Sequence, residues 1–246
     1  MDFLRPDTLA EALALKARRP DAVPIAGGTD VMVELNFDHR RPDALLDLTR
    51  IAELRAWDPD GDGGTVRIGA GVPYTRIIEE LGARLPGLAM ASRTVGSPQI
   101  RNRGTVGGNL GAASPAGDTH PVLLAAGASV EAASTRGTRL IPATDFYLGV
   151  KRNALEPDEL ITAVHVPVTR APQQFAKVGT RNAMVIAVCS FAIALHPARA
   201  AVGAAIGSAA PTPRRAPEAE EFLSAELTAD NQWEKPKPLL DSVTGR

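Results

Sequence analysis

The stretch Gly104-Thr-Val-Gly-Gly-Asn-Leu-Gly-Ala-Ala-Ser-Pro-Ala-Gly-Asp118 carries almost no side-chain bulk. Glycines of this kind let backbone N–H groups approach a ligand directly, and clusters of free N–H groups suit phosphate oxygens. A second stretch of the same character, Ile25-Ala-Gly-Gly-Thr-Asp30, lies upstream. Two glycine pairs, each followed by a small polar residue, favour one large diphosphate ligand.

The composition is typical of a globular protein with a sizeable core. The 246 residues are 44% hydrophobic and 22% charged, which suits one large domain or two modest ones. A formal net charge of −1 gives no reason to expect a nucleic acid or an anionic membrane as partner. Aromatic residues make up only 4%, so the chain lacks the stacking platforms of a single-strand binder.

A single cysteine, Cys189, excludes an internal disulfide, an iron–sulfur cluster and a cysteine-type zinc site. It indicates a reducing cytoplasmic compartment. The first residues lack the charged and apolar regions of a secretory signal. The longest apolar run, 183–195, is too short to cross a membrane and is expected to form a buried strand with Cys189 as an inert core thiol.

Hydrophobic periodicity predicts short helices and strands around the two glycine stretches. Thr8 and Glu11 have the capping-box spacing, so a helix is expected to begin there. Further helices are expected over 73–83, 86–95 and 120–126, and from about 216. Strands are expected near 23–25, 44–48, 65–68, 128–132, 159–167, 174–178, 184–195 and 200–206.

Two positions divide this pattern into domains. The turn 58–64 is rich in Asp and Gly and is the best early subdomain boundary; its acidic spacing lacks the closing Glu of a calcium loop. Beyond about residue 170 the pattern changes to strands followed by one helix. The stretch from 231 is polar and broken by prolines, so a loose tail is expected there.

No catalytic or metal constellation is recognisable. The histidines His39, His120, His165 and His196 lie far apart and show no metal-ligand spacing. No Ser-His-Asp or Cys-His arrangement is evident either, so neither a catalytic residue nor a metal ligand is assigned.

Four pieces in family order resemble the flavin-binding subunit of the molybdenum hydroxylases, the family of xanthine dehydrogenase, aerobic carbon monoxide dehydrogenase and bacterial heterocycle dehydrogenases. They are Ala26-Gly-Gly-Thr-Asp30, Gln99-Ile-Arg-Asn-Arg-Gly-Thr-Val-Gly-Gly-Asn109, Ser114-Pro-Ala-Gly-Asp118 and Phe175-Ala-Lys-Val-Gly-Thr-Arg181. The resemblance covers roughly residues 2–222. The combined motif from Ile100 to Asp118 is far more specific than a lone Gly-Gly-Thr-Asp.

The resemblance implies an FAD site. Asp118 matches an acid that binds the adenosine ribose, Ile161 an apolar position beside the cofactor, and Lys177 a lysine near the flavin, where a cation could stabilise reduced flavin. The two glycine stretches would line the diphosphate. Their implied ligand-lining residues are Pro24, Ile25, Ala26, Gly27, Gly28, Thr29, Asp30, Val31, Thr105, Val106, Gly107, Gly108 and Asn109.

Plainer interpretations stand beside these. Gly27 and Gly28 could form a structural turn, and Asp118 could cap the helix expected from His120. Lys177 could be a solvated charge on a strand edge. The arginines Arg101 and Arg103 could bind phosphate, face water or face a partner subunit.

The resemblance implies an α+β fold: an FAD-binding domain of the PCMH type over 1–170, with subdomains 1–58 and 59–170, then a small sheet-plus-helix domain over 171–246. The family's C-terminal domain continues further, so this one is expected to be shortened. The implied function is electron transfer through FAD in a heterotrimer. A molybdenum-cofactor large subunit and a [2Fe-2S] small subunit are the implied partners, in a dimer of heterotrimers.

Other functions stay open. A flavin- or nucleotide-binding protein acting alone, without turnover, is the alternative, and co-purifying molybdenum and iron proteins would distinguish it. A self-contained flavin oxidase lacks a candidate base in the sequence. A Rossmann dehydrogenase is disfavoured because neither glycine stretch has the Gly-x-Gly-x-x-Gly spacing.

Overall fold

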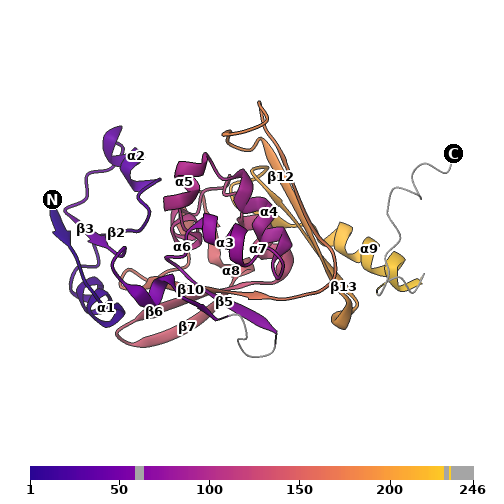
Figure 1. Cartoon of the computed structure of the whole chain (residues 1–246), viewed down its shortest axis with the longest axis horizontal. Helices are drawn as coiled ribbons and strands as arrows, with labels where there is room; N and C mark the ends of the chain where they lie inside the picture. The colour runs from indigo at the N-terminus through magenta and orange to yellow at the C-terminus, as the bar shows by residue number, and fades with distance from the viewer. Residues whose placement is uncertain (59–63, 230–232, 234–246) are drawn as a thin grey trace.

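The computed structural model describes residues 1–58, 64–229 and 233. It has the expected α+β architecture, with helices and four β-sheets following one another along the long axis of the molecule (Figure 1). Three of these sheets, called here the N-terminal, central and C-terminal sheets, carry the elements that build the candidate site.

The N-terminal sheet is parallel, with strand order β1-β3-β2. Its elements are β1 (Asp2–Leu4), α1 (Leu9–Arg18), β2 (Val23–Ile25) and β3 (Ala44–Asp47), followed by the 3-10 helix η1 (Ala52–Arg55). The capping spacing at the start of α1 is confirmed, because the Thr8 hydroxyl accepts from the Glu11 N–H at 3.2 Å. A small separate core, with Ala12, Leu46 and Ile51 at its centre, holds α1 on the sheet.

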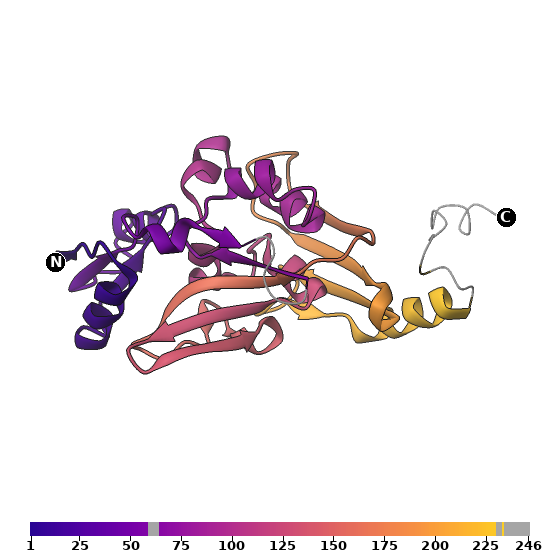
Figure 2. The ribbon, with the colours of Figure 1, turned by 60° about the horizontal axis from the view of Figure 1, so that its bottom comes forward.

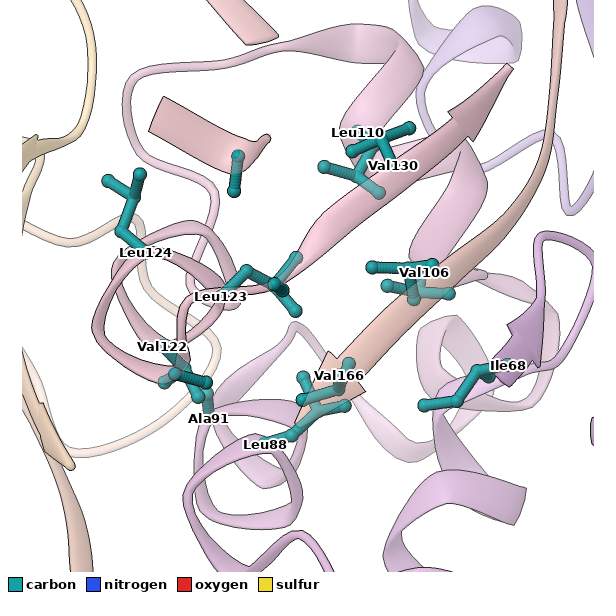
Figure 3. Close-up of a cluster of buried hydrophobic side chains, with 14 of the residues drawn as sticks. Ile68, Leu88, Ala91, Val106, Leu110, Val122, Leu123, Leu124, Val130 and Val166 are labelled. Carbon is teal, nitrogen blue, oxygen red and sulfur yellow. The ribbon is translucent and has the colours of Figure 1, made fainter. Parts of the chain in front are cut away.

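The central sheet is antiparallel, in the order β4-β5-β10-β6-β7. Helices α3, α4, α6 and α7 lie over one of its faces, where Leu88, Leu110 and Leu123 meet Ile68 and Val130 in a fully buried core (Figure 3). The elements are β4 (Trp57–Asp58), β5 (Thr65–Gly69), α3 (Tyr74–Glu80), α4 (Pro86–Thr94), α5 (Pro98–Arg103), α6 (Val106–Ala112), α7 (His120–Ala126), β6 (Ser129–Ser134), β7 (Gly137–Pro142) and β10 (Leu160–Pro167). Short α8 (Ala143–Phe146) and the hairpin β8 (Tyr147–Gly149) and β9 (Arg152–Asn153) connect β7 to β10.

The C-terminal sheet is antiparallel, in the order β11-β12-β13-β14. It lies between α4 and α7 on one side and α9 on the other (Figures 1 and 2). Ala192, Ala194 and Ala205 on its inner face belong to the same core as the central sheet. Its elements are β11 (Gln173–Val178), β12 (Cys189–His196), η2 (Pro197–Arg199), β13 (Ala201–Gly207), β14 (Arg214–Arg215) and α9 (Pro217–Ala229).

The structure corrects two sequence expectations. The glycine stretch after Gly104 forms helix α6 instead of an open loop, because the Thr105 hydroxyl caps it by accepting from the Gly108 N–H at 3.0 Å. The apolar run 183–195 is only partly a strand, since β12 begins at Cys189. Cys189 is half-buried and not a core thiol, and Ile186 and Val188 before it are exposed.

Some expectations lie outside the described residues. They are most of the turn over 58–64, in residues 59–63, and the tail from 231 except residue 233. The boundaries near residues 58 and 170 stay predictions. None of the helices within 1–58 and 64–229 is long and apolar enough to span a membrane.

Two glycines of α6 provide a matched test of its packing. A methyl group on Gly107 would lie 2.5 Å from the Ala70 Cβ and 2.6 Å from the Ala70 carbonyl oxygen, whereas one on Gly111 would meet only the Ile161 Cδ1 at 3.8 Å. We expect Gly107→Ala to lower the free energy of unfolding by ~1–3 kcal/mol, because overpacking outweighs the gain in helix propensity. Gly111→Ala should raise it by up to ~1 kcal/mol.

Urea denaturation followed by circular dichroism measures both variants. Equal effects of the two substitutions would contradict this account of how α6 is held.

Candidate functional site

The first glycine loop, residues 26–30, connects β2 to helix α2 (Val31–Asn36). Gly27 lies so close to the carbonyl of Arg103 that a methyl group there would overlap its oxygen. Gly28 has φ +77°, a left-handed conformation that glycine adopts without strain. The hydroxyl oxygen of Thr29 lies near Gly104. The loop therefore packs its backbone directly against the start of the second glycine motif, residues 104–109.

The backbone N–H groups of the first glycine loop are free of internal partners. Within the described part of the chain, none of those from Ala26 to Asp30 donates to a protein acceptor, although the loop is half-buried up to Thr29. Successive unbonded N–H groups in a turn form an anion-binding concavity. This donor set fits a diphosphate.

The second glycine motif supports the site in a different way from the one expected. The Gly107 N–H donates to the Ala70 carbonyl at 3.1 Å, and the Gly108 N–H is taken by the Thr105 hydroxyl. The expectation of free N–H groups at these two glycines is therefore wrong. Gly107 is buried by packing, as is Val106, while Gly108 is exposed and Asn109 is half-buried.

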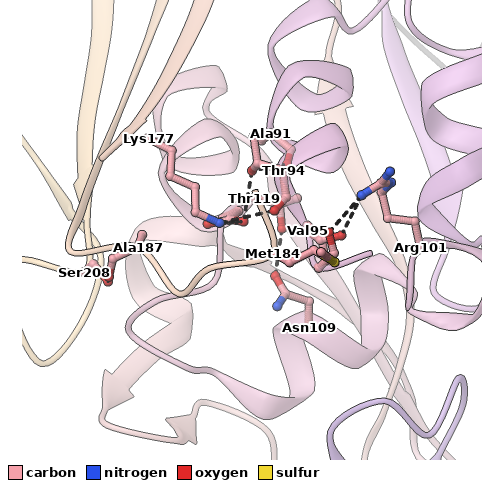
Figure 4. Close-up of polar contacts among 12 residues, drawn as sticks. Ala91, Thr94, Val95, Arg101, Asn109, Thr119, Lys177, Met184, Ala187 and Ser208 are labelled. Carbon is pink, nitrogen blue, oxygen red and sulfur yellow. Dashed lines mark hydrogen bonds and ion pairs between the residues drawn. The ribbon is translucent and has the colours of Figure 1, made fainter. Parts of the chain in front are cut away.

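A cavity of about 440 Å³ opens on the other side of α5 and α6, toward the C-terminal sheet. Its walls come from both regions of the fold (Figure 4). Val95, Gly96, Ser97, Ile100, Asn109, Ala116, Gly117 and Asp118 line it from the FAD-binding region, and Lys177, Met184, Val185 and Ile186 line it from the C-terminal region. No residue of the first glycine loop lines this cavity; α5 contributes Ile100 to its wall and contacts Gly27 through Arg103.

The most strongly constrained polar group in the cavity is the carboxylate of Asp118. Its Oδ2 atom accepts from the Lys177 Nζ at 2.6 Å and from the Thr94 hydroxyl at 2.9 Å. The two charged side chains are only 6% and 9% exposed. Burial raises the pKa of Asp118, while the hydrogen bond and charge of Lys177 and the bond from Thr94 oppose that rise. We call Thr94, Asp118 and Lys177 the clasp.

The clasp leaves hydrogen-bonding capacity unused. Asp118 Oδ1 is buried and has no partner among the described residues. The Lys177 ammonium group has three N–H donors, and its bonds to Asp118 and to the Thr94 carbonyl use two. One acceptor and one donor thus stay available beside the cavity, an arrangement that fits a ligand hydroxyl.

The clasp corrects two interpretations made from sequence. Asp118 does not cap α7, because Thr119 holds the N-cap position and its helix start has no side-chain cap. Lys177 is not a solvated charge on a strand edge. The ribose role of Asp118 and the flavin role of Lys177 stay predictions, although the ion pair places both side chains at the same point of the cavity.

The remaining assigned residues stay predictions, and the structure shows where they lie. Ile161 lies in β10 beneath α6, buried and near Gly111. Pro24 is exposed on β2, an edge strand that tolerates proline, and Val31 opens α2. Arg101 donates to the Val95 and Gly96 carbonyls and so shapes the cavity wall (Figure 4).

Sequence reasoning missed Thr94 and the cavity wall at 184–186. Thr94 is the last residue of α4 and belongs to no motif, so no local signal marks it. Residues 184–186 were hidden in an apolar run that suggested a strand. The positive φ of Met184, 50°, belongs to a chain reversal that hydrophobic periodicity does not reveal.

A buried histidine begins helix α7, next to the cavity residues Gly117 and Asp118. His120 is fully buried, with its ring against Gly117 on one side and 4.8 Å from the ring of Tyr147 on another. Its Nε2 atom lies 3.3 Å from the Asn109 carbonyl oxygen, while Nδ1 is buried without a partner among the described residues. Burial lowers the pKa of His120 to about 4, so the ring is neutral at pH 7.

This histidine should make stability depend on pH. Between pH 6.5 and about 4 the unfolded chain binds a proton on His120 that the folded chain excludes, so the free energy of unfolding should fall as the pH drops through this window. The loss should reach about 3 kcal/mol and then level off. Urea unfolding at several pH values measures it.

His120→Leu should remove this part of the pH dependence, whereas His39→Gln, at an exposed position, should not. A His120→Leu profile parallel to that of the parent chain would contradict the prediction.

Residues 1–169 match the family described as FAD binding domain in molybdopterin dehydrogenase. The nicotinate dehydrogenase FAD-subunit of Eubacterium barkeri is 38% identical over 76% of this chain and 66% of its own length. The putative xanthine dehydrogenase FAD-binding subunit of Escherichia coli K12 is 35% identical over 89% of this chain and 77% of its own. A structure of reconstituted CO dehydrogenase from Oligotropha carboxidovorans has a TM-score of 0.85 at 31% identity, covering 91% of this chain and 80% of that one.

The expected family, its FAD cofactor and its fold are thereby confirmed. Among the residues that the structure describes, no group of three or more His, Cys, Asp or Glu side chains is placed to hold a metal ion. The chain belongs to the FAD-binding subunits of the molybdenum hydroxylase family of oxidoreductases.

Proposed function

We propose that this chain is the electron-transfer subunit of a heterotrimeric molybdenum hydroxylase. It receives electrons from the [2Fe-2S] clusters of a small partner subunit and passes them to an external acceptor, while a large subunit with the molybdenum cofactor oxidises the substrate. A cytoplasmic dimer of heterotrimers is part of this proposal. The observation that carries it is the row of unbonded N–H groups over residues 26–30, packed against the second glycine motif.

The first glycine loop would hold the FAD diphosphate through its backbone. These N–H groups have no acceptor among the described residues, and phosphate oxygens can accept their hydrogen bonds. Gly27 and Gly28 are required for the loop's shape, the first by its close approach to Arg103 and the second by its positive φ. Thr29 and Asn109 would add side-chain hydrogen bonds on either side of the loop contact.

The clasp would bind a ribose of the cofactor. A sugar hydroxyl can donate to Asp118 Oδ1 and accept the unused N–H of Lys177, so both vacant groups are satisfied by one ligand group. The adenosine ribose is the part assigned to Asp118, and Lys177 belongs at the same end because the two side chains are bonded. Val95, Ile100 and Met184 would exclude water from this contact.

FAD supplies the redox chemistry when bound, since a flavin accepts single electrons and can release two together. The residues of this chain bind and orient the cofactor. The names of the relatives, a FAD-subunit and a FAD-binding subunit, describe one component of a larger enzyme, and this supports the proposed partners.

The first test is gentle purification of the native protein with an absorption spectrum and metal analysis. Flavin bands together with stoichiometric molybdenum and iron in attached subunits are expected. A flavin-containing chain without metal-bearing partners would favour a flavoprotein acting alone. A chain that takes up no added FAD would overturn the proposal.

A substitution tests the ribose contact. Asp118→Ala should raise the FAD dissociation constant about tenfold to a hundredfold, because a hydrogen bond to a charged group contributes ~1.5–3 kcal/mol. The matched control is Glu159→Ala, which removes another buried carboxylate, one paired with Arg139 away from the cavity. Quenching of flavin fluorescence in a titration measures both, and equal affinities of the two variants would refute the contact.

A further inference from the structure

We propose that Thr119 is a positioning residue of the site: its buried hydroxyl holds the side chain of Asn109 so that the amide N–H₂ group, and not the amide oxygen, is presented to the ligand. This inference rests on the proposed function, in which the Asn109 side chain hydrogen-bonds to the cofactor. It gives a role to a residue that lies outside both glycine motifs and outside the clasp.

The first argument is the contact between the two side chains. Thr119 is fully buried, and its Oγ1 atom donates to Asn109 Oδ1 at 2.9 Å (Figure 4). A carboxamide has an acceptor end and a donor end. Because Thr119 occupies the acceptor end, Nδ2 is turned away from it, and Nδ2 has no hydrogen-bond partner among the described residues. Asn109 is half-buried in the cavity wall, so this donor is available to a ligand.

The second argument is that Thr119 does not use its hydroxyl for its own helix. It holds the N-cap position of α7, where a threonine oxygen commonly accepts from an N–H of the first turn. Its backbone is instead in the αR region, with φ −81° and ψ −16°, and the side chain makes no capping bond. Pro121 in the first turn has no N–H to be capped. The hydroxyl of Thr119 is therefore free to serve Asn109.

The third argument is that the backbone of Asn109 is fixed as well. The Nε2 atom of His120, the residue after Thr119, lies 3.3 Å from the Asn109 carbonyl oxygen. A carbonyl oxygen only accepts, so Nε2 must carry a proton for this bond. The Asn109 N–H donates to the Thr105 carbonyl at 3.0 Å within α6. Two consecutive residues at the start of α7 thus hold Asn109 at its side chain and its main chain.

Fixing the carboxamide matters because its two orientations offer a ligand opposite groups. Phosphate oxygens accept hydrogen bonds, so they are attracted by Nδ2 and repelled by Oδ1. Without the Thr119 hydroxyl, rotation of the Asn109 side chain would make both orientations accessible, and ligand binding would have to select one of them. A side chain that is locked beforehand by a buried hydrogen bond avoids that loss of affinity.

The experiment uses the full chain prepared without FAD and measures the FAD dissociation constant by quenching of flavin fluorescence. Thr119→Val removes the hydroxyl and keeps the branched shape of the side chain. It should raise the dissociation constant about threefold to tenfold, the effect of one neutral hydrogen bond. Thr119→Ser keeps the hydroxyl and should bind FAD as the parent chain does.

A double-mutant cycle tests whether Thr119 acts through Asn109. Asn109→Ala removes the donor and should weaken FAD binding by itself. Adding Thr119→Val to Asn109→Ala should then weaken binding no further, because the side chain that Thr119 positions is gone. A further loss as large as that in the parent background would overturn the positioning role.

The matched control is Thr162→Val. Thr162 is also buried, and its hydroxyl donates to a side-chain oxygen, Glu131 Oε1, at 2.6 Å in the central sheet. It does not line the cavity. Urea unfolding should show a loss of stability in this variant, while its affinity for FAD stays that of the parent chain. Affinity should therefore fall only where the lost hydroxyl holds Asn109.

The chemical character of the presented group is tested with Thr119 intact. Asn109→Asp keeps the oxygen that accepts from Thr119 and replaces Nδ2 by a second, negatively charged oxygen. It should weaken FAD binding more than Asn109→Ala does, because an acceptor would face the phosphate oxygens. Parent-like affinity in Asn109→Asp would contradict the assignment of a donor at this point.

Unchanged FAD affinity in Thr119→Val, with the parent chain binding FAD, would overturn this inference alone. A parent chain that binds no FAD would overturn the proposed function instead. If Thr119→Val does not fold, Thr119→Ala takes its place in the same cycle, and Asn109→Asp tests the donor without any change at Thr119.

Discussion

The contact between Gly27 and the Arg103 carbonyl is the constraint on which the site depends. No side chain fits between these two backbones, so the first glycine loop and the second glycine motif can touch only through glycine. The contact fixes α5 and α6 against the N-terminal sheet and leaves the N–H groups of residues 26–30 turned away from internal acceptors. The proposed anion site would therefore be made of backbone N–H groups that close packing leaves unbonded.

The sequence was a good guide where the cause of structure is local. The Thr8 cap, the helix over 120–126 and the strands β5, β6 and β10 follow from spacing and hydrophobic period, and the structure has them. Helix α6 was mistaken for a loop because three glycines in seven residues lower helix propensity, whereas the Thr105 cap and the packing of Gly107 on Ala70 outweigh them. Tertiary contacts therefore determine that residues 106–112 are helical.

In the candidate site, too, features with a local cause could be predicted from the sequence and features that depend on tertiary contacts could not. Glycine motifs could be read from the chain because their function needs no side chains, and the resemblance located Asp118 and Lys177. Their pairing could not be foreseen, since 59 residues separate them and β11 reaches Asp118 only after the C-terminal sheet packs on α4 and α7. The contact of Thr94 with Asp118 could not be predicted for the same reason. The wall at 184–186 depends on a chain reversal that an apolar run conceals.

The clasp and the first glycine loop solve different physical problems. Backbone N–H groups can stay without an acceptor at little cost in folding free energy, because they are neutral and half exposed. A buried carboxylate without a partner is costly, so it needs a cation of the protein beside it to stay charged in the absence of ligand. Lysine suits this position because its three donors can satisfy Asp118 and the Thr94 carbonyl and still leave one for a ligand.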